Sequence, residues 1–436
     1  MILRRMGKFT DFSRPRIPAL VCFGVAAIFS MIPLFAGPAA PPEDTWTAIK
    51  AGRIQTVSKG EIDKGTILIR NGRIEEIGTD AAIPAAAKVL DFSDKFVMPG
   101  IVSPDSNLGI YKAPIRASES WYRQADPVGK NLAYYPVIYS VDPGHQDYAL
   151  ALRYGLTTLA LSPPPAGISG LGAVIRPEGG TLRDILVKDR AFLRISVYVN
   201  TPFLKMLKGS LEEAQKASDD QKKKKEETAA KQKEGKKKTK EVPKAEDAAD
   251  EPTISESAKV FMDVIEGRIP VLAECEEPTS LSHLLELLAG YPKIRLIVRG
   301  GPEIYKAGAL LKDKNVPVIL EPGIQIKAGF FQPVPERTNY VLKCQALGLK
   351  IAFQAQGDIE EQVRLLDHLN ELCRSGVRKD VLFQGITLIP AQLLGIDGEV
   401  GSLEKGKRAD LIVLNKDPLD DIPSIEHVIL GGRLVQ

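Results

Sequence analysis

The chain has 436 residues, of which 44% are hydrophobic and 26% are charged, and its formal net charge is +3. This length is enough for one large domain and a smaller one, and a charge so close to zero gives no reason to expect a nucleic-acid partner. The four cysteines are widely spaced, which excludes a disulfide framework and a C-x-x-C metal pair; they are Cys22, Cys275, Cys344 and Cys373. We expect the last three to be buried free thiols, with one disulfide among them as the alternative.

The N-terminus has the composition of a targeting segment. Basic side chains between Arg4 and Arg16 precede the apolar run of residues 17–35, and small residues follow it. This order is typical of a secretory signal peptide, which we assign to residues 1–40. The alternative is an uncleaved membrane anchor through residues 17–35, whose length is near that of a membrane span. Either alternative predicts an exported chain, in the periplasm or another extracytoplasmic compartment.

Short strands joined by tight turns are predicted near both ends of the mature chain. Asn71-Gly72, the preferred dipeptide of a two-residue hairpin, lies between two β-rich runs. Residues 409–414 and 427–430 repeat this style near the C-terminus. We therefore expect residues 41–97 and 403–436 to pair with each other as one small β-sandwich.

The middle of the chain alternates between strand and helix patterns. Repeated βα units of this length indicate a parallel sheet or a closed barrel, so we predict an α/β fold with a TIM-type (β/α)8 barrel over residues 98–402. The predicted strands are residues 157–161, 192–197, 270–273, 295–298, 316–320 and 350–353, and the predicted helices are residues 257–266, 280–289, 303–312 and 359–373.

One segment does not fit the barrel pattern. Residues 211–252 consist mainly of Lys, Glu, Ala, Gln and Asp and show no apolar stripe that a helix could bury. We predict that this segment is a disordered, solvated insertion in a barrel loop. A tether to a polyanion or a membrane surface is the alternative, although the interspersed acidic residues weaken it.

Motifs at both ends of the barrel resemble those of the amidohydrolase superfamily. Residues 97–102, V-M-P-G-I-V, resemble the run that leads into the family's first barrel strand, and residues 400–407, V-G-S-L-E-K-G-K, resemble its closing run. In between, residues 151–161 and 267–272 resemble strands of the imidazolonepropionase-like branch. The resemblance covers nearly the whole mature chain except the lysine-rich segment, and it implies a barrel with a β domain built from both chain ends.

The same resemblance implies a metal site whose ligands this sequence lacks. Family members use a metal, usually zinc, to activate water at the carboxyl ends of the barrel strands. The family's first-strand D-x-H-x-H run becomes S-P-D-S-N here, so that Asp105 and Asn107 occupy the two histidine positions. The fifth-strand histidine position aligns with Glu274, and the sixth-strand position falls near Arg299.

The position of the family's general base also carries a different residue in this sequence. The eighth-strand aspartate falls near Gln356, and a slip of one or two residues would make Asp358 a substitute base. Among the four histidines, two lie in predicted helices and one in the terminal β domain, which leaves His145 as the one candidate for the barrel mouth. We expect no cofactor, because the ligands of zinc, the family default, are missing.

Two functional hypotheses follow. By family the chain is a hydrolase of non-peptide carbon–nitrogen bonds, but its residues favour a catalytically degenerate protein that serves as a binding or partner subunit. The alternative is an active hydrolase in which Asp105, Glu274, Glu276 and Asp358 form a carboxylate site for Mg²⁺ or Ca²⁺. The ligand is expected to be an unknown small molecule or a protein partner rather than nucleic acid, with possible membrane attachment through residues 17–35.

Overall fold

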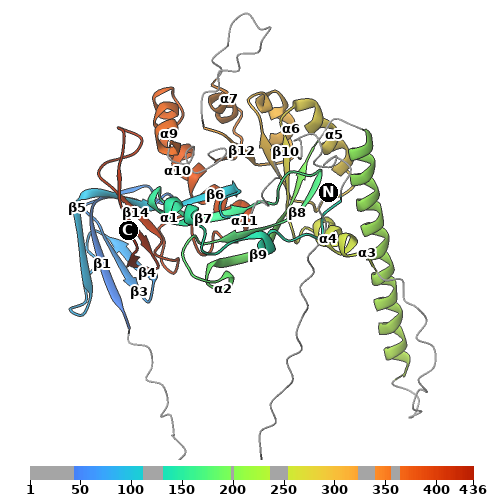
Figure 1. The fold of residues 1–436 in the computed structure, drawn as a ribbon, viewed down its shortest axis with the longest axis horizontal. Helices are drawn as coiled ribbons and strands as arrows, with labels where there is room; N and C mark the ends of the chain where they lie inside the picture. The colour runs from blue at the N-terminus through green and yellow to red at the C-terminus, as the bar shows by residue number, and fades with distance from the viewer. Residues whose placement is uncertain (1–43, 111–130, 198–200, 236–253, 323–338, 355–363) are drawn as a thin grey trace, which may run out of the picture. The chain divides into compact units, whose positions relative to one another are not determined.

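The computed structural model describes residues 44–110, 131–197, 201–235, 254–322, 339–354 and 364–436. These residues build two eight-stranded sheets, one from the two ends of the chain and one from its middle (Figure 1). The predictions for residues 1–40 and 17–35 lie outside the described residues. Within the described part of the chain, no helix is both long enough and apolar enough to span a membrane.

The first sheet joins the N-terminal and C-terminal segments. Asn71 and Gly72 both have positive φ, 51° and 79°, which is the backbone of the predicted hairpin turn. The two chain ends meet where β5 pairs antiparallel with β14, so the predicted pairing of the ends is confirmed. The segments form one hydrogen-bonded sheet in the order β16-β15-β14-β5-β1-β3-β4, with β2 paired to β1. Its strands are β1 (Trp46–Gln55), β2 (Glu61–Asp63), β3 (Thr66–Arg70), β4 (Arg73–Gly78), β5 (Lys88–Pro99), β14 (Leu411–Leu414), β15 (Ile425–Leu430) and β16 (Arg433–Leu434).

The second sheet is the predicted barrel. Its strands follow one another in sequence order from β6 to β13, and the two edge strands lie close together, so the sheet is nearly closed. Its strands are β6 (Ile101–Ser106), β7 (Leu156–Leu161), β8 (Ile168–Ile175), β9 (Leu186–Ser196), β10 (Val271–Cys275), β11 (Leu296–Gly300), β12 (Val318–Leu320) and β13 (Ile351–Phe353). The predicted α/β barrel is therefore confirmed.

One barrel strand was missed by the sequence analysis. Strand β8 runs antiparallel to β7 and to β9, whereas the other neighbouring pairs of this sheet are parallel. The link between β7 and β8, residues 162–167, is too short for the helical crossover that a parallel pair requires. A hairpin therefore replaces one βα unit of the regular pattern.

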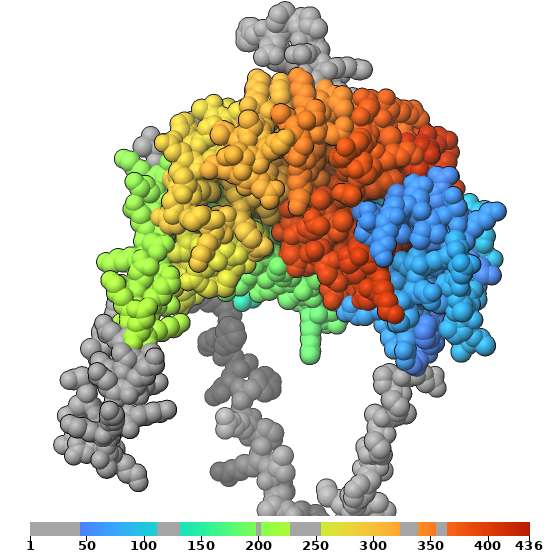
Figure 2. Space-filling model, turned by 180° about the vertical axis from the view of Figure 1, so that it is seen from behind, coloured from blue at the N-terminus to red at the C-terminus, as the bar shows by residue number. Residues whose placement is uncertain are grey.

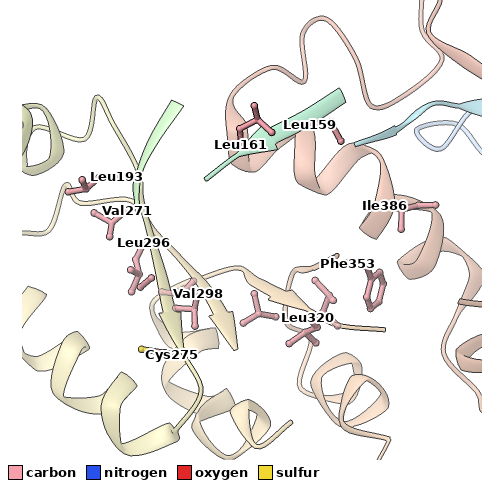
Figure 3. Packing of buried hydrophobic residues seen from close by; sticks show 14 of the residues in the cluster. Leu159, Leu161, Leu193, Val271, Cys275, Leu296, Val298, Leu320, Phe353 and Ile386 are labelled. Atoms are coloured by element: carbon pink, nitrogen blue, oxygen red, sulfur yellow. The ribbon is translucent and has the colours of Figure 1, made fainter. Parts of the chain in front are cut away.

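Helices cover the outer face of the barrel strands. Figure 3 shows side chains such as Leu159, Val271, Val298 and Phe353 packed in the layer between strands and helices. The helices are α1 (Gln146–Arg153), α2 (Leu182–Ile185), α3 (Thr201–Gly235), α4 (Glu256–Ile265), α5 (Pro278–Leu288), α6 (Gly308–Asp313), α7 (Tyr340–Ala346), α9 (Leu365–Arg374), α10 (Lys379–Ile386) and α11 (Leu388–Leu394), with 3-10 turns η3 (Val137–Ser140) and η4 (Ile304–Ala307).

The lysine-rich segment is not disordered at its start, so the prediction for residues 211–252 is wrong there. Helix α3 runs through Gly235, and Leu211, Ala214 and Ser218 are buried on it. Ser218 Oγ donates a hydrogen bond to Glu266 at the end of α4, at 3.3 Å. The spacing of three to four residues is a narrow helical stripe, which the high lysine content conceals. Residues 236–252 lie outside the described residues.

The barrel interior changes from apolar to polar along the strands. Alternate residues of a strand point to the same face, and the lower interior layer is apolar: Val102, Ala160, Val174, Phe192, Leu272, Ile297, Ile319 and Ala352, closed from below by Ala391, Leu393 and Leu394 of α11. Two residues further along six of these strands stand Ser162, Arg194, Glu274, Arg299, Glu321 and Gln354. The upper layer is therefore polar and lies at the carboxyl ends of the strands.

The prediction of three buried free thiols is confirmed for two of them. Cys275, Cys344 and Cys373 are all free, but Cys373 is only half-buried. Burial, with a smaller contribution from Glu274, raises the pKa of Cys275 to about 12. This thiol is therefore a packing group and not a nucleophile at neutral pH.

Candidate functional site

A cluster of ionic side chains occupies the polar layer at the barrel mouth, and Arg299 lies at its centre. Arg299 Nη1 donates to Glu274 Oε1 at 3.0 Å and lies 3.3 Å from Asp105 Oδ2. Its Nη2 donates to Glu321 Oε1 at 3.3 Å. One guanidinium on β11 therefore connects carboxylates from β6, from β10 and from the end of β12.

Arg194 on β9 is the second cation of the cluster. Its Nη2 donates to Glu274 Oε2 at 3.0 Å, and its Nη1 donates to the carbonyl oxygen of Pro163 at 3.2 Å and lies 3.6 Å from Asp105 Oδ1. Ser196, also on β9, donates from Oγ to Glu274 Oε2 at 3.1 Å. Both oxygens of Glu274 are thus held by guanidinium groups, one on each side.

The cluster is largely desolvated, which strengthens its interactions. The side chains of Asp105 and Arg194 are 3% and 7% exposed, and that of Arg299 is 16% exposed. Burial lowers the pKa of Arg299, but Asp105, Glu274 and Glu321 together outweigh this effect, so that the pKa lies above its usual value. Arg299 therefore remains a cation at every pH at which the protein is folded.

Glu321, directly after β12, is the third carboxylate that Arg299 contacts. Burial raises its pKa above the usual 4.5; Arg299 opposes this change, and Glu276 and Glu274 add to it. Tyr340 on α7 donates a hydrogen bond from its hydroxyl to the carbonyl oxygen of Glu321. The backbone at Glu321 is therefore anchored, and its carboxyl takes up a proton at a higher pH than an ordinary glutamate does.

The structure brings together some of the residues that the sequence singled out. Asp105, Glu274 and Arg299 meet in the cluster, whereas Asn107 lies beyond the end of β6 with an exposed side chain. Gln356 and Asp358 lie outside the described residues. Gln354 is described and occupies the polar layer at the end of β13.

Arg194, Ser196 and Glu321 were missed by the sequence analysis. Arg194 stands two residues after the buried Phe192, within a predicted strand. Glu321 stands two residues after the buried Ile319, directly after a predicted strand. That spacing was the available signal, because side chains two residues apart in a strand face the same side.

The histidines do not contribute to the cluster. His145 is the N-cap of α1, where its Nδ1 accepts a hydrogen bond from the backbone N–H of Asp147 at 3.3 Å. His283 lies on α5, His368 on α9 and His427 on β15. His145, which we considered for the barrel mouth, therefore has a structural role as a helix cap.

The residues of the cluster do not fit a zinc ion. Zinc sites of this type require neutral imidazoles and free carboxylates, yet Glu274 has both oxygens on guanidinium groups and Asp105 lies between two of them. A dication between these carboxylates would lie within a few ångströms of Arg299. In the described part of the chain, no group of three or more His, Cys, Asp and Glu side chains is arranged to hold a metal.

A cavity of about 390 Å³ lies next to the cluster. Glu274 and Ser196 belong to both, so the hydrogen-bonded carboxylate forms part of the cavity wall. The cavity is lined by Pro165, Ser196, Val197, Glu274, Glu276, Glu277 and Ser280. Its polar wall is acidic and carries hydroxyl groups, as expected of a site for a polar ligand.

Comparisons with known proteins agree with this architecture. A family model described as "Amidohydrolase family" matches residues 359–435. A dihydroorotase of Trichlorobacter lovleyi is 39% identical over 54 residues, which is 12% of this chain and 13% of the dihydroorotase. The match thus spans about an eighth of that relative.

Solved structures share the fold over most of the chain. An amidohydrolase from Thermotoga maritima superposes with a TM-score of 0.71 at 22% identity, covering 89% of this chain and 99% of that one. A molinate hydrolase superposes with a TM-score of 0.53 at 15% identity, covering 90% and 95%. At these identities the likeness shows the fold alone.

The class of protein is therefore an α/β barrel with a composite β domain and a polar cluster at the carboxyl ends of its strands. The C-terminal part of the chain matches the amidohydrolase family model, and the fold over most of its length is that of a solved amidohydrolase structure.

Proposed function

We propose that this protein is an amidohydrolase-superfamily member that binds a ligand or partner at its barrel mouth without metal-dependent hydrolysis. The observation that carries the proposal is the position of Arg299, which connects Asp105, Glu274 and Glu321. Arg299 and Arg194 stand where the carboxylates converge, so most of the charge that a metal would neutralise is already neutralised.

The energetics support this reading. At 3.0 Å each ion pair is worth about 5 kcal/mol of Coulomb energy with an effective dielectric constant of about 20. A metal would have to displace both guanidiniums or bind beside them, and either route costs several such interactions. Asp105, Glu274 and Glu321 are each ion-paired with Arg299, so none of these three carboxylates is free to deprotonate a bound water.

The test is elemental analysis of the mature protein purified without chelator, followed by assays of amide and imide hydrolysis with added Zn²⁺, Mn²⁺ and Mg²⁺. We expect no stoichiometric zinc and no metal-dependent turnover, and Glu274→His alone should restore neither, because the lost parts act together. About one equivalent of zinc, with turnover abolished by Glu274→Ala, would overturn the proposal.

Binding without turnover is tested in parallel. Calorimetry with a panel of small cyclic amides and imides should detect ligands that are recovered unchanged, and Glu276→Gln in the 390 Å³ cavity should weaken their binding. Recovery of hydrolysed compound in proportion to protein would contradict a pure binding role.

An active hydrolase with a carboxylate metal site is the second candidate. The observation that favours it is the acidic wall of the same cavity, where Glu276 and Glu277 stand beside Glu274. This candidate predicts turnover that depends on Mg²⁺ or Mn²⁺ and that disappears in both Glu276→Gln and Glu274→Gln. The assays above distinguish the two candidates.

We also propose that the chain is exported, on the basic, apolar and small-residue order of residues 1–40. Cell fractionation with intact-mass analysis tests this proposal. A full-length form in the cytoplasmic fraction would argue against export.

A further inference from the structure

A second cavity lies at the opposite end of the barrel from the charged cluster. It has a volume of about 560 Å³ and is lined by the residues that directly precede β10, β11, β12 and β13, together with residues of α5, of the loop after it and of α11. Figure 2 shows these segments, yellow to orange for residues 270–317 and red for α11, meeting on one face of the molecule.

The floor of this cavity is apolar. Leu285, Leu296, Val316 and Leu393 line it, and each is less than a tenth exposed. Such a surface favours an apolar group, since each square ångström removed from water contributes about 25 cal/mol.

The rim of the cavity carries three cations and no carboxylate. Arg295, Lys314 and Lys350 line the cavity and are exposed. Arg295 donates to the carbonyl oxygens of Gly267 and Arg268, both at 3.0 Å, so its guanidinium is held in place by neutral acceptors. Within the described residues, none of these three cations forms an ion pair.

Two further groups show where positive and negative charge lie on this face. Burial lowers the pKa of Lys188, whose ammonium donates to the carbonyl oxygen of Leu394 at the end of α11, and Arg295 lowers it further. Burial and, to a smaller extent, Glu212 of α3 raise the pKa of Tyr291. An anionic group is therefore expected at the lysine rim rather than beside Tyr291.

We propose that this cavity binds an amphiphilic organic anion, a carboxylate, sulfonate or phosphate on an apolar body. The apolar body would lie on Leu285, Leu296 and Leu393, and the anionic group would lie between Lys314 and Lys350. This site is independent of the function proposed for the barrel mouth.

The test uses two matched probes, anilinonaphthalene sulfonate and its uncharged analogue N-phenylnaphthylamine, in titrations followed by fluorescence and calorimetry. We expect the sulfonate to bind at about one equivalent, and Lys314→Gln/Lys350→Gln to weaken it about tenfold while changing the uncharged probe less than about twofold. The matched control is Lys293→Gln/Lys312→Gln, which removes two exposed lysines of the same region that do not line the cavity.

A second variant tests the apolar floor. Ala289 lines the cavity and is exposed, so Ala289→Trp fills the space without disturbing the core and should weaken both probes. The proposal is overturned if the control pair weakens the sulfonate as much as the Lys314/Lys350 pair does, or if Ala289→Trp leaves the binding of both probes unchanged.

Discussion

Replacing Arg299 by methionine removes the cation that holds the barrel mouth together. Its side chain lies 3.0–3.3 Å from three carboxylates and is 16% exposed, and the side chains of Glu274 and Glu321 are 23% and 21% exposed. Removing one partner of a buried ion pair costs about 3–5 kcal/mol, because the remaining charge is left desolvated and unpaired. Since two of the three carboxylates keep some contact with water, we expect Arg299→Met to lower the free energy of unfolding by about 3 kcal/mol near neutral pH.

The assay is equilibrium denaturation in urea, with an exposed ion pair as the control. Arg378 and Asp380 form a pair at 3.1 Å, with side chains 65% and 58% exposed. Arg378→Met should therefore cost less than about 1 kcal/mol. Equal losses in Arg299→Met and Arg378→Met would refute the electrostatic account of the cluster.

Neutral replacements and measurements at lower pH distinguish a loss of stability caused by unpaired charge from one caused by lost packing. Adding Asp105→Asn and Glu274→Gln to Arg299→Met removes the stranded charges and should recover part of the lost stability. The deficit of Arg299→Met should also shrink as the pH falls below about 5, because Glu321, whose pKa is raised, takes up a proton in the folded state. A triple variant no more stable than Arg299→Met, with a deficit independent of pH, would attribute the loss to packing instead.

Two further predictions concern Glu321 and α3. Because the folded pKa of Glu321 is raised, its stabilising contribution is present below the unfolded pKa and is lost as the pH rises through the folded pKa. Urea titrations from about pH 4 to about pH 7 should therefore show Glu321→Gln becoming progressively more stable relative to the wild type, and a constant difference would contradict the raised pKa. Leu211 on α3 is 1% exposed, so Leu211→Ala should cost about 3 kcal/mol in the same assay, whereas the exposed Lys223→Ala should cost less than about 0.5 kcal/mol. If Leu211→Ala is as mild as Lys223→Ala, the start of α3 is not part of the core.

Local patterns determined much of the fold. The hairpin at Asn71-Gly72 requires two residues with positive φ, and this dipeptide supplies them at low cost. Most barrel strands are short runs of buried apolar residues between turn signals, which made them visible in the sequence. Strand β8 was not visible because Gly170 and Gly172 lower its strand propensity. The buried stripe of α3 was not visible because it is narrow and surrounded by lysines.

From the motifs alone, the resemblance predicted that Asp105, Asn107 and Glu274 stand at the family's histidine positions, and this stays a prediction. Only the tertiary structure decided which charged side chains meet there. Arg194 and Arg299 are separated from Asp105 by many residues along the chain, yet barrel closure brings all three to one mouth. An ion pair depends on distance and burial, and both are set by the closed sheet rather than by any local stretch of sequence.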